Sequence, residues 1–126
     1  NLNKIGVIFN LDPHYKGGSH WVSVFIDIKS KMIYYFDSVG EKIPKQIKKF
    51  CKKVQSQATI LGIDMKIDEI YPHEHQKKDT ECGVYSIYFV TNMIKSIKIW
   101  DSTFKKGKIS DEEMAKYRKV YFNTVY

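Results

Sequence analysis

One stretch of the chain is apolar on nearly every side: residues 82–94, CGVYSIYFVTNMI. It is too long for a typical strand and long enough for a helix, and a helix that is apolar all round is buried in a core. We therefore expect a central helix that begins near Cys82, directly after the polar segment 73–81.

The segments before this helix predict a β-hairpin. The runs 20–28 and 32–36 are rich in the β-branched and aromatic residues that strands prefer, and polar residues separate them. With a loop at Lys29-Ser30, His20 lies on the same face as Asp37, one diagonal step away. The register that follows pairs Ile28 with Lys31 and Val22 with Asp37.

The rest of the chain supplies further elements. Lys4–Phe9 suits a buried strand, and Met65–Tyr71 resembles another strand that ends at Pro72. Ser110, with Glu113 three residues later, has the capping-box pattern that begins a final helix.

An amphipathic surface helix is expected from Pro44 to about Gly62. One side carries an apolar stripe: Ile43, Ile47, Phe50, Cys51, Val54 and Ala58. The other side carries lysines: Lys45, Lys48, Lys49, Lys52 and Lys53.

The pattern as a whole predicts an α+β fold, with a mixed central β-sheet and a buried helix that carries Cys82 at its N-terminus. At 126 residues the chain is expected to form a single domain, residues 1–126. The first strand begins almost at the first residue. We therefore expect an N-terminally truncated piece, the C-terminal part of a longer domain.

Composition limits the class of protein. The chain is 43% hydrophobic and 28% charged, as in a folded core, and no apolar run approaches the roughly 20 residues of a membrane span. The N-terminal residues lack the pattern of a signal peptide. We therefore expect the two cysteines to be reduced thiols in an intracellular, monomeric protein that contacts no membrane. The net charge of +7 is the difference between 21 basic residues, all lysine except Arg118, and 14 acidic residues. It suits either a solvated surface or a nonspecific nucleic-acid or acidic-partner surface.

Cys82 is the residue whose predicted place suggests chemistry. At the first turn of a buried helix, unpaired N–H groups and the helix dipole favour the reactive thiolate, and Gly83 would let a substrate backbone come close. A thiolate nucleophile needs a histidine to move its proton and a third group to orient that ring; His20 and Asp37 are available. Each residue also has a structural interpretation: Cys82 as a small buried hydrophobe, His20 as a strand-edge residue and Asp37 as a turn-former.

A metal site is the competing interpretation. His73-Glu74-His75 and Cys82, with His14 or His20 from elsewhere, supply ligand types that zinc accepts. Their spacing matches no standard zinc pattern, so no metal is expected and solvent-exposed loop histidines are the alternative.

A set of ordered motifs resembles a known family. The motifs are His20-Trp21, then Tyr35-Phe36-Asp37-Ser38, then Gln76 six positions before Cys82, and Glu81-Cys82-Gly83-Val84-Tyr85. They are similar to those of the ubiquitin-like protein-specific cysteine proteases, the superfamily of SUMO proteases and adenain. The resemblance runs from about Val7 to Ile94, and the tail from Lys108 to Phe122 is similar to that of members from large DNA viruses.

The resemblance implies an adenain-like and SUMO protease-like version of the papain-type core, and it implies roles for individual residues. Cys82 would be the nucleophile, His20 the general base and then acid, and Asp37 the group that holds the imidazole. Gln76 would donate its side-chain N–H to the oxyanion, beside the backbone N–H of Cys82.

Substrate contacts are implied as well. Trp21 would roof a narrow channel over a substrate Gly-Gly. Its alternative is a core or hairpin aromatic. The sequence departs from the family in its shorter length and in Glu81, which stands where Asp or Asn often precedes the cysteine.

The expected function is therefore a cysteine endopeptidase that cleaves after Gly-Gly-type sites, with a viral structural polyprotein as the preferred substrate. The alternatives are deconjugation of SUMO or another ubiquitin-like protein, and an inactive fold that binds ubiquitin-like tails or nucleic acid. No cofactor is expected, apart from a nucleic-acid activator of the kind adenain-like proteases use, contacted nonspecifically through Lys45–Lys53. A viral member would act in the host cytoplasm and virion, and a cellular SUMO protease in the nucleus.

Overall fold

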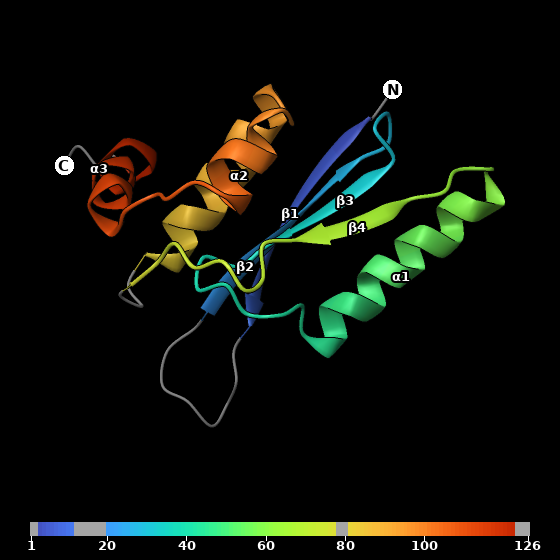
Figure 1. Cartoon of the computed structure of the whole chain (residues 1–126), viewed down its shortest axis with the longest axis horizontal. Helices are drawn as coiled ribbons and strands as arrows, with labels where there is room; N and C mark the ends of the chain where they lie inside the picture. The colour runs from blue at the N-terminus through green and yellow to red at the C-terminus, as the bar shows by residue number, and fades with distance from the viewer. Residues whose placement is uncertain (1–2, 12–19, 78–80, 123–126) are drawn as a thin grey trace.

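The computed structural model describes residues 3–11, 20–77 and 81–122, and it confirms the α+β fold. A mixed sheet has the strand order β1-β2-β3-β4, with β1 Lys4–Leu11, β2 His20–Asp27, β3 Met32–Phe36 and β4 Lys66–Glu69. The pairs β1–β2 and β2–β3 are antiparallel, whereas β4 runs parallel to β3. Figure 1 shows the sheet between helix α1 (Lys45–Ile60) on one side and helices α2 (Cys82–Lys95) and α3 (Asp111–Tyr121) on the other.

The hairpin of β2 and β3 has the predicted register. Ser23 lies opposite Phe36 and Asp27 opposite Met32, which continues the predicted pairing of Val22 with Asp37. The turn is closed by the backbone N–H of Lys31, which donates to the carbonyl of Ile28 at 3.2 Å. The two strands therefore bring His20 and Asp37 to the same end of the sheet.

The predicted amphipathic helix is confirmed as α1, which covers one face of the sheet. Its buried residues Ile47 and Cys51 pack against side chains of β2 and β3 such as Val24 and Tyr35. The helix is followed by Gly62, whose φ of 78° lies in the left-handed region that favours glycine. The lysines on the other side of α1 are exposed.

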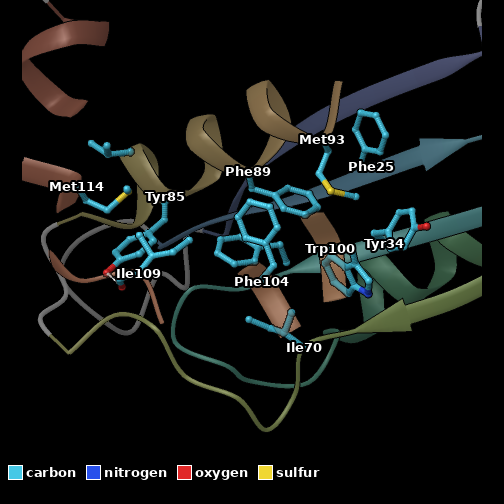
Figure 2. Packing of buried hydrophobic residues seen from close by; sticks show 12 residues of the cluster. Phe25, Tyr34, Ile70, Tyr85, Phe89, Met93, Trp100, Phe104, Ile109 and Met114 are labelled. Atoms are coloured by element: carbon cyan, nitrogen blue, oxygen red, sulfur yellow. Dashed lines mark hydrogen bonds between the residues drawn. The ribbon is translucent and has the colours of Figure 1, made fainter. Parts of the chain in front are cut away.

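The predicted central helix is confirmed as α2, which covers the opposite face of the sheet. Its residues Tyr85, Phe89 and Met93 are fully buried, and the ring of Phe89 stacks on Phe36 of β3 with centroids 4.9 Å apart. Figure 2 shows the side chains of this cluster between α2 and the sheet. Burying each such side chain contributes roughly 1.5–3 kcal/mol, so this layer fixes where α2 begins.

The chain after α2 contains an element that the sequence analysis did not predict. A π-helix, η1 (Trp100–Lys105), places Trp100 and Phe104 beneath α2, and the indole N–H of Trp100 donates to Asp68 of β4 at 2.9 Å. The final helix begins as predicted, because the Ser110 side chain accepts a hydrogen bond from the Glu113 backbone N–H at 3.1 Å.

Two strand predictions need correction. The run Lys4–Phe9 is a strand but not a buried one, since β1 lies at the sheet edge and leaves Ile5 and Ile8 exposed. The segment Met65–Tyr71 forms a shorter strand than predicted, because β4 ends at Glu69 and Tyr71 lies in a turn. Among the described residues, no helix has the length and apolar character that crossing a membrane requires.

Candidate active site

The thiol of Cys82 lies at the first residue of α2, as predicted. The residue is 5% exposed, and its Sγ accepts a hydrogen bond from the backbone N–H of Trp21 at 3.4 Å. The start of a helix carries N–H groups without partners in a preceding turn, together with the positive end of the helix dipole. Cys82 therefore occupies a position that favours a negative charge on sulfur.

His20 joins this cysteine to Asp37. Its Nε2 donates to Asp37 Oδ1 at 2.8 Å, and its ring also forms a hydrogen bond with Cys82. Because Nε2 is committed to the carboxylate, Nδ1 is the ring atom left for the sulfur. The Asp37 carboxylate is 2% exposed and is itself fixed by the backbone N–H of Val39, which donates to Oδ1 at 2.9 Å.

The electrostatics of this trio favour an ion pair. Hydrogen bonds to Asp37 and to Cys82 raise the pKa of His20 to about 10, although burial of the ring opposes this. Burial also opposes ionisation of Cys82, but the hydrogen bonds from His20 and from the Trp21 N–H outweigh it and hold the pKa of Cys82 below its ordinary value. The lowered pKa of Cys82 and the raised pKa of His20 both favour the thiolate–imidazolium form of the pair.

Gln76 reaches the site through Ser38, the residue after Asp37. The Gln76 side-chain oxygen Oε1 accepts a hydrogen bond from Ser38 Oγ at 2.6 Å, and the Gln76 backbone N–H donates to the Ser38 carbonyl at 2.8 Å. Its side-chain nitrogen Nε2 is buried and has no hydrogen-bond partner among the described residues. Gln76 thus presents an unused N–H donor.

The turn after Asp37 has a backbone conformation that allows the contact between Ser38 and Gln76. Gly40, whose backbone N–H donates to the Asp37 carbonyl at 2.8 Å, has a φ of 84°. A Cβ at Gly40 would lie 2.4 Å from the carbonyl oxygen of His73, so only glycine fits there. The close approach holds the segment that carries Gln76 against the end of β3.

Trp21 and Gly83 lie together beside Cys82. A Cβ built on Gly83 would lie 3.7 Å from Trp21 Cδ1, and the indole is 37% exposed. Trp21 is therefore not a core aromatic, and the space above Gly83 is bounded by a partly exposed ring.

The histidines of the metal interpretation have structural partners. His75 is fully buried; its Nε2 donates to the carbonyl of Phe104 at 2.6 Å, and its Nδ1 accepts from the N–H of Ile109 at 3.0 Å. The Nε2 of His73 contacts the carbonyl oxygen of Gly107. Among the described residues, no group of His, Cys, Asp and Glu side chains could hold a metal ion, and His14 lies outside those residues.

Sequence reasoning missed the residues that hold the site from the C-terminal side. Asp111 accepts a hydrogen bond from the Tyr85 hydroxyl at 2.9 Å through Oδ1 and from the backbone N–H of Lys77 at 3.1 Å through Oδ2. These bonds fix the chain next to Gln76 and the helix one turn after Cys82. No local sequence pattern predicts these two hydrogen bonds, because each joins residues more than 25 positions apart.

Comparison with known proteins identifies the family. The model of the Ulp1 protease family, C-terminal catalytic domain, matches residues 2–126. The chain belongs to this family. The resemblance inferred from the motifs is thereby confirmed, and it extends beyond Ile94 to the end of the chain.

Two viral relatives match most of the chain. The chain is 30% identical over 122 residues to the SUMO-1 cysteine protease S273R of African swine fever virus, a match that covers 95% of the chain and 44% of the relative. It is 34% identical over 122 residues to R355 of Acanthamoeba polyphaga mimivirus, described by name as a thiol protease, with 96% of the chain and 39% of the relative covered. The chain therefore spans less than half the length of these two relatives.

A solved structure supports the same assignment. The crystal structure of the African swine fever virus pS273R protease superposes with a TM-score of 0.86 at 29% identity, covering 98% of this chain and 45% of that one. The sheet and helices described above are thus those of an Ulp1-family protease.

Proposed function

We propose that the protein is a cysteine endopeptidase that uses Cys82 as nucleophile, His20 as general base and acid, Asp37 as the group that orients the imidazole, and Gln76 as an oxyanion donor. The single observation that carries the proposal is the position of His20, hydrogen-bonded to both Asp37 and Cys82 at the start of α2. Membership of a peptidase family supports the same assignment.

In the first half of the reaction, the Cys82 thiolate attacks the carbonyl carbon of the scissile peptide bond. The negative charge that develops on the carbonyl oxygen is held by Gln76 Nε2 and by the backbone N–H of Cys82; such a donor is commonly worth about 3–4 kcal/mol. The imidazolium of His20 then gives its proton to the leaving amine, and a thioester to Cys82 remains.

In the second half, His20 is neutral and takes a proton from a water molecule that attacks the thioester. The tetrahedral intermediate uses the same oxyanion donors. When it collapses, the acid product leaves, and the proton held by His20 restores the ion pair with the Cys82 thiolate. Asp37 keeps the ring in one orientation and tautomer during both transfers.

For substrate, we propose a protein cleaved after a Gly-Gly-type site. The support is that Gly83, next to Cys82, has no side chain and that the neighbouring Trp21 ring is partly exposed, an arrangement that suits the approach of a chain segment without side chains. The viral source of two relatives suits a viral structural polyprotein processed in an infected host cell, whereas the name SUMO-1 cysteine protease of one of them suits the alternative, deconjugation of SUMO or another ubiquitin-like protein.

A covalent probe tests the proposal directly. A Gly-Gly peptide with a vinyl-type electrophile is expected to add to Cys82, with the adduct read by mass on the Cys51→Ala variant, in which Cys82 is the remaining thiol. Labelling by the bare peptide indicates a self-contained endopeptidase, whereas labelling that needs a SUMO-fused probe indicates deconjugation. No adduct on folded full-length protein would refute the proposed nucleophile.

Substitutions provide the second arm of the test. Cys82→Ala and His20→Ala are each expected to abolish peptide hydrolysis, while Cys51→Ala keeps it. Cys51 is a suitable control because it is buried in the α1 layer and burial raises its pKa to about 11, so it stays a thiol. Full hydrolysis by the Cys82 or His20 variant would exclude the mechanism.

We also propose that α1 makes a nonspecific contact with nucleic acid. The observation in favour is that the exposed side of α1 carries five lysines and the helix contains no acidic residue. Such a surface attracts phosphates without reading bases. Binding of this kind without any reactivity of Cys82 would favour the alternative of an inactive family fold.

A further inference from the structure

Asp37 and Ser38 are adjacent at the end of β3, yet their side chains contact two different parts of the site. The carboxylate of Asp37 accepts from His20 Nε2 at 2.8 Å, and the hydroxyl of Ser38 donates to Gln76 Oε1 at 2.6 Å. Both residues are almost completely buried, at 2% and 1% exposure. One dipeptide therefore contacts both the proposed base and the proposed oxyanion donor.

The orientation of the Gln76 carboxamide decides whether it can help the reaction. Its two ends have opposite character: Nε2 donates hydrogen bonds and Oε1 accepts them. An oxyanion is stabilised only by the nitrogen end, and a carbonyl oxygen turned toward it would be repelled. A free carboxamide can rotate, so some contact must select one of the two orientations.

The contacts of Gln76 make that selection. Its Oε1 is engaged by Ser38, while Nε2 is buried and has no partner among the described residues. A buried donor without a partner is unfavourable, so Gln76 Nε2 stands ready to donate to an atom of a bound substrate. The main chain adds to the constraint, since the N–H groups of His75 and Gln76 both donate to the Ser38 carbonyl, at 2.9 and 2.8 Å.

We propose that Ser38 is a positioning residue of the peptidase: its hydroxyl holds Gln76 Oε1 so that Nε2 faces the oxyanion. This inference rests on the proposed function and adds to it a residue that does not touch substrate. It assigns separate tasks to two neighbours, with Asp37 orienting the base and Ser38 orienting the oxyanion donor.

The first test is Ser38→Ala in the full-length protein, assayed with a Gly-Gly aminomethylcoumarin peptide. Loss of one oxyanion donor costs about 10²–10³-fold in kcat, so loss of its orientation is expected to lower kcat by about 10- to 100-fold with KM little changed. Ser23→Ala is the matched control, because Ser23 is equally buried on the neighbouring strand and its hydroxyl has no partner among the described residues. It is expected to keep wild-type kcat.

A double-mutant cycle separates positioning from a general structural effect. If Ser38 acts through Gln76, Ser38→Ala is expected to have no further effect on kcat in a Gln76→Ala background. Alkylation of Cys82 by iodoacetamide forms no oxyanion. Its rate and pH profile are therefore expected to be the same in Ser38→Ala and in the wild type.

The outcomes distinguish this inference from the proposed function. Wild-type kcat in Ser38→Ala, or multiplicative losses in the double variant, would overturn the role of Ser38 while leaving Cys82 and His20 as proposed. Hydrolysis that survives Cys82→Ala would overturn both. If Ser38→Ala does not fold, Ser38→Thr and Ser38→Val replace it as a pair of nearly equal shape, and equal kcat in these two would exclude a role for the hydroxyl.

Discussion

The guanidinium of Arg118 binds the carboxylate of Glu81 through two contacts. Nε donates to Oε2 at 3.1 Å, and Nη2 lies 3.0 Å from Oε1. Glu81 directly precedes Cys82, and its side chain is only 12% exposed. An unpaired carboxylate there would repel a thiolate and raise the pKa of Cys82, so the pairing with Arg118 neutralises a charge that would oppose ionisation of Cys82.

The first prediction follows from this pair. Arg118→Met is expected to raise the pKa of Cys82 and to slow its alkylation by iodoacetamide at neutral pH by about fivefold, the equivalent of about 1 kcal/mol for a partly exposed ion pair. The rates should converge at high pH, where the thiol is ionised in both proteins. Lys119→Met, an exposed neighbour on α3, is the control. A pH profile of Arg118→Met that coincides with the control would contradict the prediction.

The second prediction concerns the pH dependence of the ion pair. Thiolate is present above the lowered pKa of Cys82, and imidazolium is lost near the His20 pKa of about 10. Peptide hydrolysis should therefore rise through a pKa below 9 and fall near 10, with both limbs belonging to the coupled pair. Asp37→Asn removes the main cause of the raised His20 pKa, so the alkaline limb should move to lower pH. An unmoved alkaline limb would exclude Asp37 as that cause.

The hydrogen bond between His20 and Asp37 also makes the free energy of unfolding depend on pH. The pKa of His20 is raised from 6.5 to about 10 on folding, so its contribution is fully present below pH 6.5 and is lost as pH rises through 10. Unfolding midpoints of the wild type and Asp37→Asn should therefore converge above pH 10.

Which parts of the fold can be predicted from the sequence depends on how far apart in the chain the interacting residues lie. The register of the hairpin and the position of α2 were predicted, because alternation of side chains and an apolar run are local signals. The position of β1 was not, because burial of a strand depends on whether a second neighbour covers it.

The site divides in the same way. His20, Asp37 and Cys82 could be proposed from their places at element ends, whereas the role of Gln76 came from resemblance alone. Ser38 and Arg118 were not proposed, since their partners lie 38 and 37 positions away and only the folded chain brings them together.

The third prediction concerns the loss of folding stability in acid caused by the buried His75, the residue before Gln76. Burial lowers the pKa of His75 from 6.5 to about 4, so the native state holds it neutral while the unfolded state binds a proton. Stability is then expected to fall by up to about 3 kcal/mol as pH drops from 6.5 to 4. His75→Gln should be less stable at neutral pH but lose less stability over this range. Chemical unfolding at each pH measures this, and parallel slopes for wild type and His75→Gln would refute it.

The fourth prediction separates stability from activity at Gly83. Its added Cβ would make an ordinary contact with Trp21 at 3.7 Å, and alanine is the better helix former. Gly83→Ala should therefore keep or raise the thermal midpoint. It should lower kcat/KM for a Gly-Gly substrate by about tenfold or more, because the proposed substrate backbone would then have to approach Cys82 past a side chain at position 83. Small iodoacetamide should still react with Cys82 at the wild-type rate; a slowed reaction would mean that the thiolate itself is disturbed.

The fifth prediction assigns the exposed lysines of α1 to nucleic-acid binding. Replacing Lys45, Lys48, Lys49 and Lys52 by Gln should lower the affinity for duplex DNA. Each lost phosphate contact should reduce the slope of log K against log salt by about 0.9.

Total charge must be separated from position in that experiment. The matched control replaces four exposed lysines elsewhere with Gln: Lys95, Lys98, Lys116 and Lys119. The two variants have equal net charge, so any difference in affinity and salt slope reports on α1 itself. Equal losses in both variants would mean that only net charge matters, and unchanged binding in the α1 variant would assign its lysines to solubility. A further outcome is that DNA raises kcat of the wild type but not of the α1 variant. That result would show that DNA bound at α1 activates peptide hydrolysis, because the control variant has the same net charge.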